Sequence, residues 1–211
     1  MKLVFASNNA HKLDEVRAIM PVEVQILSLH DIGFEQEIEE NGTTLEENSK
    51  IKADTVYQWL RVTGYGLPVD GVFADDTGLE IDALNGQPGV YTARWYRLND
   101  GMSAAAPLND ERMIFAANRA KALRELSGKT NRGAQFKTVI TLIRIAQNET
   151  VQVEGVVRGR IATEEYGQGG FGYDPIFIPE GYDKTFGELP ADLKNSISHR
   201  ARAMEALVKI L

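Results

Sequence analysis

The first thirty residues alternate between short apolar runs and one amphipathic segment, and this alternation limits the folds open to the chain. Residues 2–6 read KLVFA, which is typical of a buried strand. After a polar turn, Leu13, Val16 and Met20 recur at the spacing of one helical face. Residues 22–29 are again largely apolar. Strand, helix and strand in this order predict a βαβ unit, and therefore an α/β fold.

The rest of the chain extends this pattern with longer elements. Thr44 followed by Glu47 is a capping box, which predicts a helix over about 45–62. The pattern predicts a buried strand over 69–74 that ends at Asp75. The remaining expected elements are a weaker strand over 79–84, a loop over 85–107, a helix over 108–126, strands over 136–145, 151–161 and 176–178, and a last helix over 196–211. We expect a mixed sheet, with the middle of the chain forming a second lobe.

Composition narrows the class of protein. The 211 residues are enough for one domain with two lobes, so we expect a single domain over 1–211. A formal net charge of −7 argues against general attraction to nucleic acid or anionic lipid. The absence of Cys excludes disulfides and cysteine-ligated metals. No apolar run approaches the roughly 20 residues of a membrane span, and the apolar start is too short for a signal peptide, so we expect a cytoplasmic protein.

Two polar segments follow expected strands. Residues 7–12 read SNNAHK, and a helix is expected to begin within them. A helix N-terminus suits phosphate and disfavours Lys12 unless an anion binds there, although a solvated lysine beside a capping Asn is the alternative. Asp75 and Asp76 stand where ligands bind in open parallel sheets. Such a pair suits Mg²⁺ and a general base, although a polar turn capped by Asp explains it as well.

Further basic residues lie where a helix disfavours them. Lys52 falls within the apolar stripe of its helix, which is unfavourable unless its ammonium reaches water, a carboxylate or a ligand anion. His199 and Arg200 occupy the first turn of the last expected helix, and Lys194 lies just upstream. These residues indicate an anionic or carbonyl-bearing ligand. A snorkelling lysine and a solvated basic turn remain open as alternatives.

The segment 169–175 reads GGFGYDP and places two aromatic residues among glycines. Such a segment suits a nucleobase stacked close to the backbone, with Asp174 accepting a hydrogen bond from a ring N–H. The alternative is a tight turn with one buried aromatic side chain.

Together these segments resemble the inosine triphosphate pyrophosphatase (Ham1-like) family. Each segment alone is weak evidence, but they occur in the family's order over nearly the whole chain, and the ordered set is specific. The matching segments are 7–12 (SNNAHK), 40–43 (ENGT), Asn48 with 52–53 (KA), 74–79 (ADDTGL), 88–94 (PGVYTAR), 169–175 and 198–200 (SHR). The family more often has Thr-Gly-Asn in place of Ser7-Asn8-Asn9, and the segment 96–108 diverges.

The resemblance implies an elongated mixed central sheet flanked by helices, and two lobes with the active site in the cleft between them. It implies hydrolysis of inosine, deoxyinosine and xanthosine triphosphates (ITP, dITP, XTP) to the monophosphate and pyrophosphate, with Mg²⁺, by a homodimer. Asp76 is the expected catalytic base, and Glu40 and Asp76 are the expected metal ligands. The expected substrate-binding residues are Ser7, Asn8, Asn9, Ala10, His11, Lys12, Lys52, Asp75, Thr77, Phe171, Gly172, Tyr173, Asp174, Lys194, His199 and Arg200.

These roles predict a mechanism. Lys12 and Lys52 add positive charge at the phosphates, and Asp76 deprotonates the water that attacks the α-phosphorus. Arg200 only donates hydrogen bonds, so it suits a 6-oxo purine and opposes the amino group of adenine, while the rejection of guanine stays unexplained. Two other functions remain open: a pyrophosphatase for modified pyrimidine nucleotides, and a nucleotide-binding sensor without activity.

Overall fold

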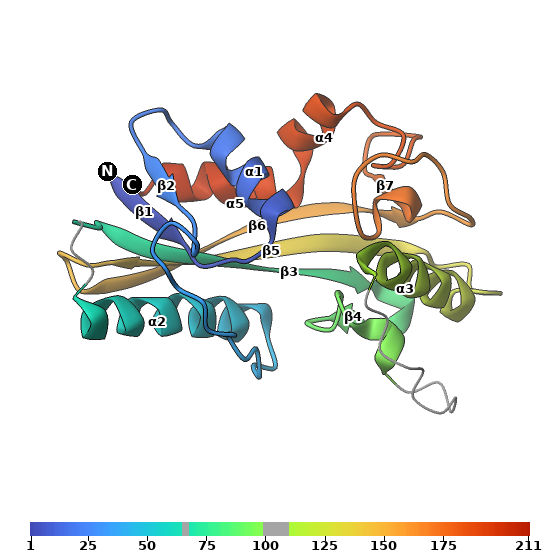
Figure 1. The fold of residues 1–211 in the computed structure, drawn as a ribbon. Helices are drawn as coiled ribbons and strands as arrows, with labels where there is room; N and C mark the ends of the chain where they lie inside the picture. Colours follow the sequence, from blue (N-terminus) through green and yellow to red (C-terminus); the bar gives the residue numbers. More distant parts are fainter. Residues whose placement is uncertain (65–67, 99–109) are drawn as a thin grey trace. The chain divides into compact units, whose positions relative to one another are not determined.

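The chain folds into a β-sheet with helices packed on it (Figure 1). The computed structural model describes residues 1–64, 68–98 and 110–211. The helices are α1 (Ala10–Ile19), α2 (Leu45–Thr63), α3 (Glu111–Glu125), α4 (Ala191–Ile197) and α5 (His199–Val208). The strands are β1 (Lys2–Phe5), β2 (Gln25–Leu27), β3 (Gly71–Ile81), β4 (Pro88–Gly89), β5 (Gly133–Arg144), β6 (Glu149–Ile161) and β7 (Phe177–Pro179). None of the helices in these residues is long and apolar enough to cross a membrane.

The sheet is mixed, as the sequence predicted. Within the described residues its strand order is β2-β1-β3-β5-β6-β7, and β4 pairs with β3. Strand β1 runs parallel to both β2 and β3, which confirms the expected βαβ unit at the start of the chain. The pairs β3–β4 and β6–β7 are antiparallel.

The chain divides into two compact units by its internal contacts. Unit 1 contains Met1–Asp76, Thr138–Gly155 and His199–Leu211, and unit 2 contains Thr77–Lys137 and Val156–Ser198. The single domain over 1–211, and the cleft expected between two lobes, stay predictions.

Unit 1 buries both faces of its strands. Val4 of β1 packs into a cluster with Val56 of α2, whereas Leu3 and Phe5 pack into a second cluster with residues of α1 and α5. Figure 1 accordingly shows α2 on one face of the strands and α1 and α5 on the other. Because successive side chains of a strand point to opposite faces, a strand covered on both faces must be apolar throughout. The continuous apolar run of residues 3–6 meets this requirement.

Unit 2 has a core rich in aromatic side chains. Phe136 of β5 lies 4.7 Å from Phe177 of β7, and Phe177 lies 5.3 Å from Phe186, measured between ring centroids. Ala122 and Leu126 of the α3 region pack into the same cluster. Tyr173 and Ile176, which follow the glycine-rich residues 167–172, belong to this cluster.

The structure corrects the prediction that a strand ends at Asp75. Strand β3 continues through Asp75 and Asp76 to Ile81 without a turn. Acidic residues suggested a turn because isolated carboxylates are rarely buried, but both aspartates are paired with cations here. The strand that does end at this level is β1, whose last residue is Phe5; directly after it, the Ala6 amide donates to the Phe73 carbonyl of β3 at 2.8 Å.

The expected last helix over 196–211 corresponds to α5, which begins at His199, and residues 191–197 form a separate helix, α4, that was not predicted. Ser198 has an extended backbone (φ −67°, ψ 159°) and closes α4 by donating to the Lys194 carbonyl, so α5 begins anew at His199. The expected loop over 85–107 contains the short strand β4 and a 3-10 helix at Trp95–Arg97, and its residues 99–107 lie outside the described residues. Residues 108 and 109 of the expected helix, and 99–108 of the divergent segment, lie outside them as well.

Candidate active site

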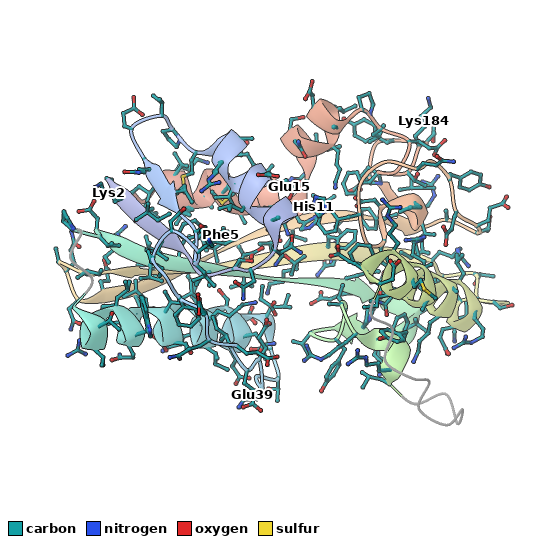
Figure 2. The ribbon with its side chains drawn as sticks, in the orientation of Figure 1. Lys2, Phe5, His11, Glu15, Glu39 and Lys184 are labelled. Atoms are coloured by element: carbon teal, nitrogen blue, oxygen red, sulfur yellow. The ribbon has the colours of Figure 1, made fainter. Side chains whose placement is uncertain are left out.

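The turn after β1 leads directly into α1. The Asn9 side chain caps the helix by accepting a hydrogen bond from the Lys12 amide at 3.1 Å. The Asn9 amide in turn donates to the Ser7 hydroxyl at 3.3 Å. The side chains of Asn8, Ala10 and His11 are exposed around this turn. Figure 2 labels His11 on α1, at the start of the helix. The capped turn therefore directs Lys12 back toward the strands.

Lys12 and Arg200 meet at Asp75. The Lys12 Nζ lies 3.0 Å from one Asp75 oxygen, and the Arg200 Nε lies 3.3 Å from the other. Arg200 is 2% exposed, and its Nη1 donates to the carboxylate of Glu15 on α1. Figure 2 labels Glu15 on this helix. Two cations and two carboxylates thus form one chain of ion pairs across β3, α1 and α5.

The cations keep Asp75 ionised. Burial by itself would raise the pKa of Asp75, but the charges of Lys12, Arg200 and Lys52 outweigh burial and hold this pKa far below the ordinary range. Burial lowers the pKa of Lys12 more than Asp75 raises it. For Arg200, burial is outweighed by Asp75 and Glu15, which raise its pKa. Asp75 is therefore a fixed anion and a poor candidate for a group that gains a proton.

Lys52 joins the two expected metal ligands. Its Nζ lies 2.9 Å from an Asp76 oxygen and 3.0 Å from a Glu40 oxygen. Burial would lower the pKa of Lys52, but Asp76, Asp75 and Glu40 raise it. The pKa of Asp76 is raised, mainly because burial disfavours its charge more than Lys52 favours it. Adjacent residues of one strand thus shift in opposite directions, with Asp75 held as an anion and Asp76 more ready to accept a proton.

Glu40 and Asp76 fit a magnesium site by their chemistry. Both present carboxylate oxygens, and the Glu40 side chain keeps 33% of its surface exposed. Within the described parts of the chain, no group of three or more His, Cys, Asp or Glu residues could hold a metal by itself. Mg²⁺ commonly binds through one or two carboxylates together with substrate phosphates and water, so two carboxylates suffice only with a phosphate ligand.

In unit 2, three of the expected base-side residues lie together. The Lys194 Nζ lies 2.7 Å from an Asp174 oxygen and 4.8 Å from the centroid of the Phe171 ring. The Phe171 amide donates to the same Asp174 oxygen at 2.7 Å. Phe171 is half-buried and packs near Phe115, with 6.2 Å between the ring centroids. A ring, an acceptor and a cation side by side can stack on and hydrogen-bond a planar heterocycle.

The other expected residues of unit 2 contact mainly other protein groups. Tyr173 is 3% exposed, its hydroxyl donates to the Thr92 carbonyl at 3.1 Å, and burial raises its pKa. Its ring packs in the core of unit 2. The Gly172 carbonyl accepts from Arg119 at 2.9 Å. Thr77 continues β3 and is half-buried. Of the pair at the start of α5, His199 is buried in unit 1 beside Arg200.

Two residues of the arrangement are absent from the expected site. Glu15 lies three positions after Lys12 on α1, a spacing that places both on one side of a helix, but only the structure reveals its partner Arg200. Asn48 belongs to a segment that matches the family, but its polar character gave no sign of burial. It is 0% exposed, and its oxygen accepts from the Gly42 amide at 2.9 Å.

The fold and this site define an α/β protein with buried ion pairs at Asp75 and Asp76 of β3, close to the end of the parallel strand β1. The chain belongs to the Ham1 family, whose model matches residues 3–210. A dITP/XTP pyrophosphatase of Flavobacterium johnsoniae is 44% identical over 211 residues, which cover 100% of this chain and 98% of that protein. A dITP/XTP pyrophosphatase of Bacillus subtilis is 43% identical over 211 residues, which cover 99% of this chain and 96% of that protein. The solved Ham1 protein of Staphylococcus aureus is 35% identical, with a TM-score of 0.80 over 100% of this chain and 97% of that chain.

Proposed function

We propose that this chain hydrolyses ITP, dITP and XTP to the nucleoside monophosphate and pyrophosphate, and so removes non-standard purines from the nucleotide pool. Its relatives of 43% and 44% identity carry the name dITP/XTP pyrophosphatase, and the ordered motifs predict the same activity. The observation that carries the proposal is the ammonium of Lys52 lying between the carboxylates of Glu40 and Asp76.

A lysine in this position suits a triphosphate. Lys52 stays charged although it is buried, and it lies on α2 with its Nζ directed at two carboxylates. Lys12 reaches the neighbouring Asp75 from the capped turn of α1. Both ammonium groups are point charges with three donors each, which phosphate oxygens accept readily. Lys12 and Lys52 therefore bind and orient the phosphates.

Asp76 is the general base of the reaction in this proposal. A general base must accept a proton near neutral pH, and burial moves the pKa of Asp76 in that direction. Asp75 is held as an anion by Lys12 and Arg200, so it fixes the positions of these cations and does not take the proton. Asp76 accepts the proton of the water that attacks the α-phosphorus, and pyrophosphate leaves from the opposite side.

Glu40 and Asp76 would hold Mg²⁺ together with oxygens of the bound triphosphate. Such an ion supplies charge neutralisation at the pyrophosphate that leaves. Lys52 already balances both carboxylates when the nucleotide is absent, so the two negative side chains can stand close together before substrate binds. This arrangement keeps the ligands prepared without a third protein carboxylate.

The nucleobase of the substrate is bound by unit 2 in this proposal. Phe171 supplies a ring for stacking, and Asp174 accepts from a purine N–H, such as the N1–H of hypoxanthine. Lys194 holds Asp174 at 2.7 Å and can donate to a 6-oxo group. A base-side role is also proposed for Arg200, whose Nε and Nη1 donate to Asp75 and Glu15. Gly172, Tyr173 and His199 are proposed to shape this site.

We also propose that the protein acts as a cytoplasmic homodimer that binds neither nucleic acid nor membranes. The net charge of −7 supports the last part, because both of these partners are negatively charged. Light scattering coupled to size exclusion at several concentrations would decide the oligomeric state. A monomer at all concentrations would rule out the dimer.

A substrate panel with product identification tests the activity. The protein is incubated with Mg²⁺ and, separately, ITP, dITP, XTP, GTP, ATP and modified pyrimidine triphosphates. We expect pyrophosphate and the monophosphate from the first three. Orthophosphate with a diphosphate would contradict the proposal, preference for a pyrimidine would favour the nearest alternative, and tight binding without turnover would indicate a sensor. Asp76→Asn should abolish turnover while the unfolding transition remains.

A further inference from the structure

Asn48 connects helix α2 to the segment that carries Glu40. It lies one helical turn before Lys52 on α2, and it is buried completely. Its side-chain oxygen accepts a hydrogen bond from the Gly42 amide at 2.9 Å. Lys52 holds the Glu40 carboxylate at 3.0 Å. The helix therefore holds this segment at two points, one on the backbone and one on the carboxylate.

The Asn48 amide has a defined orientation and an unused donor. A backbone N–H requires an acceptor, so the oxygen of the amide must face Gly42. The nitrogen, Nδ2, is buried and has no hydrogen-bond partner within the described residues. A buried donor without a partner lowers the stability of a fold. An apolar side chain of the same size would avoid this loss but would leave the Gly42 amide without its acceptor, so the function of Asn48 lies in its contact with Gly42.

The backbone of the segment also touches the helix. A Cβ added at Gly42 would lie 2.6 Å from the Asn48 oxygen and 2.8 Å from the Cβ of Glu47. Both distances are shorter than a van der Waals contact, so only glycine permits this close approach of the backbone to α2. Gly42 lies only two residues after Glu40. Because the chain between them is so short, a shift of the backbone at Gly42 also moves the Glu40 carboxylate.

We infer that Asn48 is a positioning residue that holds the backbone of residues 40–43 on α2 and thereby keeps the Glu40 carboxylate beside Lys52 and Asp76. The inference rests on the proposed function, in which Glu40 is a ligand of Mg²⁺. Groups that orient a ligand change metal affinity or activity by about 10–100-fold when they are removed. Asn48 acts through Glu40 and does not itself touch the substrate.

The test uses Asn48→Leu, which keeps the approximate size and removes the amide. We expect the Mg²⁺ concentration for half-maximal hydrolysis of ITP to rise about tenfold, with recovery of the rate at high Mg²⁺. Binding of Mn²⁺ to the protein with a non-hydrolysable ITP analogue, measured by electron paramagnetic resonance, should weaken in parallel. The thermal midpoint should stay within about 2 °C of the wild type, because removal of a buried unpaired donor offsets the loss of the acceptor for the half-buried Gly42 amide.

Gly42→Ala provides a second variant that leaves Asn48 in place. It should raise the same Mg²⁺ concentration, because the added Cβ forces the segment off the helix. Thr55→Val is the matched control on α2, since the Thr55 hydroxyl donates only to the helix's own Ile51 carbonyl at 2.7 Å. This control should leave the Mg²⁺ dependence unchanged.

Amide hydrogen exchange separates this inference from the proposed function. The Gly42 amide should be protected in the wild type and exchange at least tenfold faster in Asn48→Leu, whether or not ITP is a substrate. Failure of the wild type to hydrolyse any triphosphate would refute the proposed function alone. Unchanged Gly42 exchange, or a lowered thermal midpoint with unchanged Mg²⁺ dependence and Mn²⁺ binding, would overturn the role of Asn48. If Asn48→Leu does not fold, an unchanged Mg²⁺ dependence of Gly42→Ala would overturn it.

Discussion

The Lys12 ammonium lies 3.0 Å from the Asp75 carboxylate, and the two residues stand 63 positions apart in the chain. The pair joins the first turn of α1 to the middle of β3, and Asp75 is only 2% exposed. Removing one partner from a buried pair leaves an uncompensated charge, which is far more unfavourable than loss of an exposed pair.

Asp75→Asn should lower the free energy of unfolding by roughly 3 kcal/mol, because Lys12 and Arg200 lose their shared anion. Urea denaturation at pH 7 measures the change. Asp54→Asn is a matched control, since Asp54 pairs with Lys50 on the exposed side of α2. Its effect should stay below about 0.5 kcal/mol. Equal effects of the two substitutions would show that the buried Asp75 contributes no more to stability than an exposed carboxylate.

Glu15→Gln should destabilise the protein by about 1–3 kcal/mol, because Arg200 is buried and loses one of its two carboxylates. Asp14→Asn changes an exposed neighbour on the same helix and should have little effect. Denaturation of both variants under the same conditions decides the point. A stability of Glu15→Gln equal to the wild type would mean that Arg200 needs only Asp75.

Lys52→Met should lower kcat/KM for ITP by at least about 100-fold, because it removes a donor placed at the phosphates and leaves two carboxylates without their cation. Lys52→Arg should not restore activity, since a planar guanidinium differs in shape from an ammonium. Lys50→Met, on the exposed side of α2, serves as the control and should retain activity. Substantial activity of Lys52→Met would exclude Lys52 from the reaction.

Asp31 should contribute to stability in a pH-dependent way. It accepts a hydrogen bond from the Ser28 amide at 2.8 Å, and mainly this bond lowers its pKa below the ordinary value of 3.8. A lowered pKa in the folded state means that the contribution is complete above about pH 4 and is lost as the pH falls through the lowered value. The difference in unfolding free energy between the wild type and Asp31→Asn should therefore shrink below pH 4. A difference that grows on acidification would contradict the assignment.

Gly155→Ala should destabilise the protein by about 1–3 kcal/mol, since the added methyl group would overlap the backbone of α5 at His199 and Ala203. Gly155 lies on β6, and its absent side chain lets the helix approach the strand. Glu154→Ala, at an exposed neighbouring position, is the control for a change in the same strand. Thermal unfolding of both variants measures the effect, and an unaltered Gly155→Ala would imply that the helix moves away easily.

Elements with a strong local pattern could be predicted well. The apolar run of β1, the periodicity of α1 and the capping box of α2 each depend on residues close in sequence. Thr44 accepts from the Glu47 amide as expected, although the Glu47 carboxylate reaches back to Thr43. Strand β3 was predicted to end too early, because the cations that allow Asp75 and Asp76 to be buried come from distant parts of the chain.

The site shows the same division. The unfavourable position of Lys52 in an apolar stripe indicated that its ammonium reaches water, a carboxylate or a ligand anion, since helical periodicity is local. The structure shows that it reaches two carboxylates. Asn48 was not predicted as part of the site, because only the contact with Gly42 makes its burial meaningful. Membership of the Ham1 family, predicted from the order of the motifs, is confirmed by the family model and the relatives.

The sequence by itself determined the α/β class, the family and, apart from Glu15, the charged residues of the site. Only the tertiary structure decided how these charges pair. Asp75 is shared by Lys12 and Arg200, and Lys52 by Glu40 and Asp76. The reason is physical: periodicity and capping act over a few residues, whereas the strength of an ion pair depends on distance and burial, which folding sets between residues as far apart as Asp75 and Arg200.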